Sequence, residues 1–180
     1  MEIERKFLVP CLPEGYDTHP FHQIEQAYLC TDPVVRIRQE DEDFCLTYKG
    51  KGLLSREEYT LPLTREAYAH LLPKADGSVL TKKRYFIPLD NSDHLTIELD
   101  VFEGRYAGLI LAEVEFTTEE EALSFQPPKW FGRDVTFTRE YQNSSLWMVV
   151  DAGGGVREGK GEEGVGYGCG ASRAKPPETG

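Results

Sequence analysis

The sequence predicts a mainly β protein, a closed antiparallel barrel of eight strands with a few helices packed on its outside. Three observations lead to this fold class. Runs of alternating polar and apolar residues fill residues 1–117, turn-forming residues separate the runs, and the charges on their polar faces are grouped by sign. The chain of 180 residues is long enough for one domain with a substantial core and short for two.

Eight alternating runs are expected to form strands, separated by turn signals such as TDP, GKG and LDNSD. They cover residues 2–9, 23–30, 33–40, 43–50, 56–63, 79–88, 94–102 and 109–117. Two short helices are also expected. The first covers residues 64–73, with Thr64 as its N-cap and Pro73 as its end. The second begins after Thr118, which has capping-box spacing to Glu121.

The composition changes near residue 151. Residues 151–180 hold 10 of the 17 glycines and show no apolar periodicity. We therefore expect a barrel domain over residues 1–150, followed by a flexible glycine-rich tail over residues 151–180. Within the barrel domain, residues 129–150 look irregular and are expected to end in a helical turn.

The charge balance and the lack of targeting signals narrow the class of function. A net charge of −11 argues against a general nucleic-acid binder, because little would neutralise the phosphate backbone. The chain has neither a signal-peptide stretch nor an apolar run near ~18 residues, so we expect a cytoplasmic protein without a membrane partner. The 4 cysteines and 4 histidines lack metal-ligand spacing, and free thiols are expected.

Charges of one sign gather on the same face of a run, whereas solvated faces usually mix signs. Acids share a face over residues 2–4, 98–100 and 113–115, and cations share one over residues 36–38 and 82–84. Rows of like charge need counter-charges, so the carboxylates indicate a divalent cation and the guanidinium groups indicate phosphate oxygens. A closed barrel around a metal-bound polyphosphate satisfies both rows. A sandwich with solvated charged faces is the alternative.

The motifs that carry these charges follow one another as EIERKF, VRIR, TYKG, SRxEY, KxRY, ELDVF and AEVEF. In this order they resemble the CYTH superfamily, also called triphosphate tunnel metalloenzymes, over residues 1–147. The later WFGRDVT and YQNSSL look like the C-terminal segment of the same family. The resemblance implies an eight-stranded tunnel that binds a linear triphosphate with Mg²⁺ or Mn²⁺. Short bacterial members that begin with EIERKF, which act mainly as inorganic triphosphatases, are the most similar.

The resemblance also implies roles for individual side chains. Metal ligands are expected at Glu2, Glu4, Asp100, Glu113 and Glu115. Phosphate-binding cations are expected at Arg36, Arg38, Lys49, Arg56, Lys82 and Arg84. Lys6 and Tyr28 are expected as a catalytic dyad, in which Lys6 is hydrogen-bonded to Tyr28 and accepts a proton from the attacking water. Independently of the resemblance, Glu58 and Glu98 are expected to have a structural role, as ion-pair partners that orient the arginines.

The function expected from these residues is divalent-metal-dependent hydrolysis of inorganic triphosphate to pyrophosphate and phosphate. An adenylyl cyclase of the same fold is an alternative, which would need a purine pocket at one mouth of the tunnel. Thiamine and nucleoside triphosphates are alternative substrates. A non-catalytic polyphosphate-binding module is a further alternative, which could lose the carboxylates that this chain retains. The expected partner is the small-molecule substrate, and the resemblance also allows a homodimer.

Overall fold

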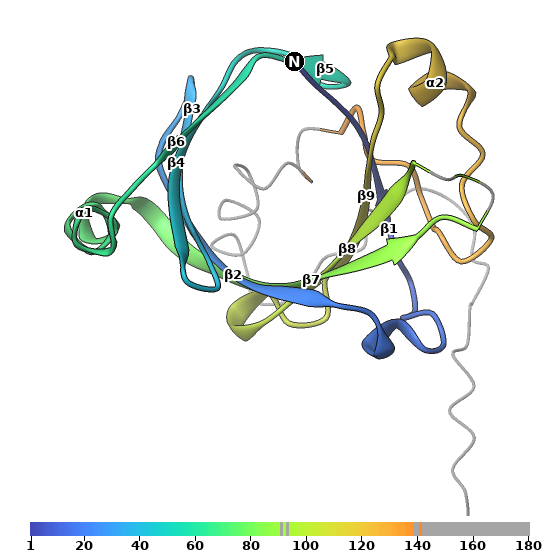
Figure 1. Ribbon diagram of the computed structural model, residues 1–180, viewed down its shortest axis with the longest axis horizontal. Helices are drawn as coiled ribbons and strands as arrows, with labels where there is room; N and C mark the ends of the chain where they lie inside the picture. Colours follow the sequence, from blue (N-terminus) through green and yellow to red (C-terminus); the bar gives the residue numbers. More distant parts are fainter. Residues whose placement is uncertain (91, 93, 139–140, 142–180) are drawn as a thin grey trace, which may run out of the picture.

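In the computed structural model, one strongly curved antiparallel sheet forms a nearly closed barrel (Figure 1). The structure describes residues 1–90, 92, 94–138 and 141. The strands are β1 (Glu2–Leu8), β2 (Phe21–Thr31), β3 (Val34–Glu40), β4 (Asp43–Lys49), β5 (Ser55–Arg56), β6 (Glu58–Pro62), β7 (Asp76–Pro88), β8 (Thr96–Phe102) and β9 (Ile110–Glu115). Their order in the sheet is β5-β1-β9-β8-β7-β2-β3-β4-β6, and every neighbouring pair is antiparallel.

The predicted strand over residues 56–63 closes the barrel, and the structure divides it in two at Glu57. Its first part, β5, pairs with β1 through Glu2 and Arg56. Its second part, β6, pairs with β4 through Lys49 and Glu58. The expected eight strands are therefore nine, because one continuous segment changes its partner as it passes from one end of the sheet to the other.

The turn that leads into β5 requires glycine. Gly52 has φ +141°, and a Cβ on it would lie 1.9 Å from the Ser55 carbonyl oxygen. A backbone conformation of this kind is rarely open to residues with a side chain. The GKG motif, read from the sequence as a turn signal, thus allows the tight approach that places β5 beside β1.

Both predicted helices are present, and both lie outside the barrel. Thr64 caps α1 (Arg65–Leu71) by accepting a hydrogen bond from the Ala67 amide at 3.1 Å. Thr118 caps α2 (Glu119–Ser124) in the same way, through the Glu121 amide at 3.2 Å. Short 3₁₀ helices are η1 (Tyr16–Thr18), η2 (Leu72–Lys74), which contains Pro73 and follows α1 directly, and η3 (Gly104–Tyr106).

The apolar faces of the strands point outward, and the helices cover them. Phe7 and Val114 on the outer wall pack in one cluster with Ala122 of α2, while Ile37 packs with Tyr68 of α1. Figure 1 shows α1 and α2 on opposite flanks of the ring. The hydrophobic core therefore surrounds the barrel, which leaves its interior to the polar faces of the strands.

Three sequence expectations concern the end of the chain and its surroundings. The described part of residues 129–150 is irregular, apart from one isolated bridge between Phe7 and Asp134. The expected final helical turn and the expected tail over residues 151–180 lie outside the described residues. Within the part of the chain that the structure describes, no helix has the length and apolar character needed to cross a membrane.

Candidate active site

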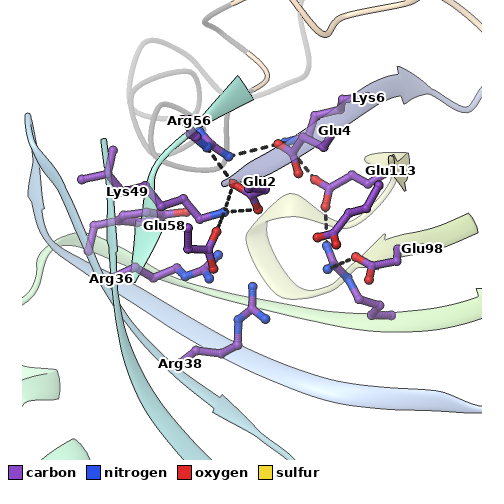
Figure 2. Close-up of a pocket in the computed structure, with 14 residues that line it drawn as sticks. Glu2, Glu4, Lys6, Arg36, Arg38, Lys49, Arg56, Glu58, Glu98 and Glu113 are labelled. Atoms are coloured by element: carbon purple, nitrogen blue, oxygen red, sulfur yellow. Dashed lines mark hydrogen bonds and ion pairs between the residues drawn. The ribbon is translucent and has the colours of Figure 1, made fainter. Parts of the chain in front are cut away.

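The interior of the barrel contains a charged cavity of about 130 Å³ (Figure 2). It is lined by Glu2, Glu4, Lys6, Tyr28, Val34, Arg36, Arg38, Lys49, Arg56, Glu58, Arg84, Glu98, Glu113 and Glu115. All of these except Val34 carry ionisable side chains. The charged faces therefore point inward, as the grouping of their signs predicted, and the solvated-sandwich alternative is wrong.

Strand alternation alone selects these side chains. In β1, Glu4 and Lys6 point into the cavity, while Ile3 and Phe7 join the apolar cluster outside. The same alternation brings lining residues inward from each of the other strands of the sheet, β2 to β9. Because successive side chains on a strand point to opposite faces, a shift of one residue in register would have placed every one of them in solvent or in the core.

Lys82 and Asp100 depart from the predicted site, because neither lines the cavity. Both are fully buried and form an ion pair with each other, while Arg84 donates to Asp100 from Nε at 2.7 Å. The pKa of Lys82 is lowered to about 8, because burial and then the neighbouring Arg84 outweigh the attraction of Asp100. The two residues lie behind Arg84 rather than beside the cavity, so in this arrangement they contact a ligand only through it.

Most lining carboxylates are paired with cations across the cavity. Glu2 contacts Lys49 at 2.7 Å and Arg56 at 2.8 Å, and Glu4 contacts Arg56 at 3.0 Å. Glu113 lies 2.8 Å from Lys6. Glu58 and Glu98, expected as ion-pair partners, contact Lys49 and Arg84 respectively, and both also line the cavity. The acidic and basic rows therefore neutralise each other in this structure.

Arg36 is the exception on the basic side. Its side chain is only 4% exposed, and its Nε lacks a hydrogen-bond partner. Among the described residues its guanidinium donates a 3.4 Å hydrogen bond from Nη2 to Thr47, and no carboxylate forms an ion pair with it. Burial lowers its pKa, and the adjacent Arg38 lowers it further. A buried cation without a counter-ion is costly, so this side of the cavity is suited to an anion that supplies the missing charge.

Figure 2 shows Arg36 and Arg38 extending from β3 toward the cavity, opposite Glu98 and Glu113. The Nε of Arg38 also lacks a hydrogen-bond partner in the described structure, although its Nη1 contacts Glu40 at 3.2 Å. Two adjacent guanidinium groups with unpaired donors form a fork geometry that matches phosphate oxygens.

Lys6 and Tyr28 both line the cavity, but the hydrogen bond expected between them is not formed in the described structure. The Lys6 ammonium contacts Glu113 at 2.8 Å and Glu4 at 3.6 Å. Burial by itself lowers the pKa of Lys6, but these two carboxylates outweigh it and the net pKa is raised. The Tyr28 hydroxyl instead accepts from Gln26 at 3.1 Å, and burial raises the pKa of Tyr28.

Surplus negative charge collects at the acidic end of the cavity. The pKa of Glu115 is raised to about 7, first by burial and then by the nearby Glu98, Glu2 and Glu4. Within the described residues no cation forms an ion pair with Glu115, and no three acidic, histidine or cysteine side chains are arranged as a complete metal site. Carboxylate oxygens suit hard divalent cations, so these residues fit such an ion once their cationic partners move to another anion.

The CYTH domain family matches residues 1–147 of the chain. The chain belongs to the CYTH family. Two curated relatives are both named inorganic triphosphatase. The one from Nitrosomonas europaea is 40% identical over 152 residues, which cover 83% of this chain and 98% of the relative. The one from Acetivibrio thermocellus is 32% identical over 152 residues, which cover 81% of this chain and 92% of the relative.

Solved structures of similar proteins support the fold. A crystal structure of an inorganic triphosphatase is 36% identical, with a TM-score of 0.62 over 82% of this chain and 95% of that one. A protein from Bacillus halodurans is 17% identical, with a TM-score of 0.56 over 77% of this chain and 97% of that one. At that identity the second likeness shows the fold alone.

Proposed function

We propose that this CYTH protein hydrolyses inorganic triphosphate to pyrophosphate and phosphate inside the barrel, with Mg²⁺ or Mn²⁺ as cofactor. Family membership implies a divalent metal, and the choice between these two ions is part of the proposal. The observation that carries it is Arg36, a buried cation facing the cavity without a carboxylate partner among the described residues. A linear polyphosphate supplies the anionic oxygens that such a group needs.

The basic side of the cavity would hold the phosphates that do not react. Arg36 and Arg38 provide unpaired guanidinium donors, and Lys49, Arg56 and Arg84 provide further positive charge after leaving their carboxylates. Fixed cations of this kind position a phosphoryl group and stabilise the charge that develops on it. Lys82 would act indirectly, because it lies behind Arg84.

The acidic side would hold the metal. Glu2, Glu4, Glu113 and Glu115 line the cavity and are the proposed ligands, whereas Asp100 would orient Arg84 from behind. A divalent cation bound there would lower the pKa of the attacking water and neutralise phosphate oxygens. The surplus negative charge around Glu115 supports this assignment.

Lys6 and Tyr28 remain the proposed catalytic pair, with a condition on Lys6. Contacts with Glu113 and Glu4 raise the pKa of Lys6, so Lys6 stays protonated as long as these two carboxylates contact its ammonium group. It can accept a proton from water only when both acids are engaged elsewhere. Tyr28, neutral at physiological pH because its pKa is raised, would donate a hydrogen bond into the cavity.

One assay separates the candidate reactions. Purified protein is incubated with tripolyphosphate, ATP or thiamine triphosphate, each with Mg²⁺, Mn²⁺ or a chelator, while phosphate and cyclic AMP are measured. The proposal expects metal-dependent phosphate release that is fastest from tripolyphosphate. Tripolyphosphate binding without turnover would support a binding module, and cyclic AMP would support a cyclase. Either result would overturn the proposal.

A matched pair of variants connects the activity to the cavity. Arg36→Met removes the unpaired buried cation, whereas Arg65→Met removes an arginine that lies 60% exposed at the start of α1. We expect Arg36→Met to weaken tripolyphosphate binding strongly and Arg65→Met to leave it unchanged. Cytoplasmic location and homodimer formation stay predictions, and size measurement of the purified protein in solution would test the second.

A further inference from the structure

Gln26, in the middle of β2, is a buried amide that the sequence analysis did not single out. It is fully buried, and its Nε2 donates a 3.1 Å hydrogen bond to the Tyr28 hydroxyl. Its Oε1 has no hydrogen-bond partner in the described structure. A buried amide with one unpaired atom stabilises the folded protein less than an apolar side chain of the same size would. What a glutamine provides at this position is therefore the hydrogen bond to Tyr28.

Gln26 and Tyr28 lie two residues apart on β2, so their side chains point to the same face of the sheet, and the neighbouring strand β7 is irregular beside them. On one side, Gln26 pairs with Leu80 of β7 while Tyr28 pairs with Asp76, so the single residue between them opposes residues 77–79. On the other side they face Arg38 and Arg36 of β3. Bulges of this kind redirect side chains and are frequent next to active sites.

The donor in this hydrogen bond determines what the phenol can do. A tyrosine hydroxyl has one hydrogen and two acceptor lone pairs. The Gln26 amide nitrogen occupies a lone pair, which leaves the hydroxyl hydrogen free to point elsewhere. Of the charged groups that act on the Tyr28 hydroxyl, Arg36, Lys6 and Arg38 cannot accept that hydrogen. The carboxylate of Glu113 could accept it, but no hydrogen bond joins the two residues in the described structure. The hydrogen is therefore available to an oxygen in the cavity that Tyr28 lines.

We propose that Gln26 is a positioning residue that fixes the Tyr28 hydroxyl as a hydrogen-bond donor to an oxygen of the bound triphosphate. The inference rests on the proposed function and adds a specific residue to it. It replaces the expected anchor, Lys6, which contacts Glu113 and Glu4 instead. Donation to a phosphate oxygen stabilises negative charge that grows during bond cleavage, so its loss is expected mainly in kcat.

A double-mutant cycle tests this role. Gln26→Met removes the amide at nearly constant volume, and Tyr28→Phe removes the hydroxyl. We expect Gln26→Met to lower kcat for tripolyphosphate about fivefold to tenfold, the size of one hydrogen bond, with KM unchanged within about twofold. In the Tyr28→Phe background the same substitution should change kcat by less than about twofold, because its effect passes through the missing hydroxyl.

Gln26→Glu gives a second test that preserves the shape of the side chain. An ionised carboxylate only accepts, so it would draw the Tyr28 hydrogen away from the cavity and lower kcat by a similar factor. Gln39→Met is the matched control, since Gln39 lies on β3 and its amide bonds the Asp41 carbonyl at 2.8 Å, outside the cavity lining. This control should retain wild-type kcat and KM.

The outcomes separate the two proposals. The positioning role would be overturned if Gln26→Met lowered kcat by the same factor in the wild-type and Tyr28→Phe backgrounds. It would also be overturned if neither Gln26 variant lowered kcat. Both results would leave the triphosphatase proposal intact. An inactive wild-type protein would overturn the proposed function, and this inference with it. If Gln26→Met does not fold, the cycle is run with Gln26→Glu and Tyr28→Phe and is judged by the same criterion.

Discussion

Arg36→Met should stabilise the ligand-free protein while weakening its binding of tripolyphosphate. The guanidinium is 4% exposed, and its Nε lacks a partner. Burial of a charge costs several kcal/mol, and a well-packed apolar side chain often recovers about 1–4 kcal/mol at such positions. For a chain of this size each kcal/mol corresponds to about 2–4 °C in Tm. The substitution should therefore raise the Tm measurably.

Binding should change in the opposite direction. Each charge-assisted hydrogen bond contributes about 1.5–3 kcal/mol, so loss of the Arg36 contact should weaken tripolyphosphate binding about tenfold to a hundredfold. Calorimetric unfolding in chelator measures the first effect, and titration calorimetry with tripolyphosphate and metal measures the second. Arg65→Met, at an exposed pair with Glu42, should change stability by at most about 1 kcal/mol. A lower Tm for Arg36→Met would refute the view that Arg36 is an unsatisfied cation.

Other positions give three further tests. Burial and Glu98 raise the pKa of Glu115 in the folded protein from the usual 4.5 to about 7. Between these pH values the folded state binds a proton that the unfolded state has released. Without metal, the free energy of unfolding should therefore fall as the pH rises from 4.5 to 7. Glu115→Gln should flatten that slope in urea titrations, and an unchanged slope would contradict the assignment. Lys82→Met should lower stability by about 1–3 kcal/mol in the same titrations, because Asp100 loses one of its two buried cationic partners and keeps Arg84; a neutral effect would show that the pair is dispensable. Gly52→Ala should lower the Tm, since its Cβ would meet a carbonyl oxygen at 1.9 Å, and an unchanged Tm would show that the turn can rearrange.

Strand alternation made much of the site predictable from the sequence. If Glu2 and Glu4 face inward, alternation along the strand assigns each remaining residue of β1 to the inner or the outer face. The same alternation places Arg36 and Arg38 of β3 inside the barrel. The grouping of like charges on these faces then favoured the interior of a barrel over a face exposed to solvent. These inferences depend only on local chain geometry, which a sequence encodes directly.

Depth along the barrel was not predictable in this way. Lys82 and Asp100 have the correct direction, but strand tilt and stagger place them behind Arg84. The division of the fifth predicted strand depends on which strand lies across the closing gap, a long-range property. Gln26 was missed because a single neutral amide in a strand carries no charge pattern, although its spacing of two from Tyr28 was a signal that both share a face.

The ion pairs across the cavity have a thermodynamic consequence. Lys49 contacts both Glu2 and Glu58, so a polyanion that attracts Lys49 leaves two acids exposed to each other's repulsion. A cation relieves that repulsion, and in doing so releases the lysine for the polyanion. By linkage, each ligand must strengthen the binding of the other by the same factor. We therefore expect the protein to select the preformed metal–polyphosphate complex over either free ion, a selectivity that arises from its own internal charge pairing.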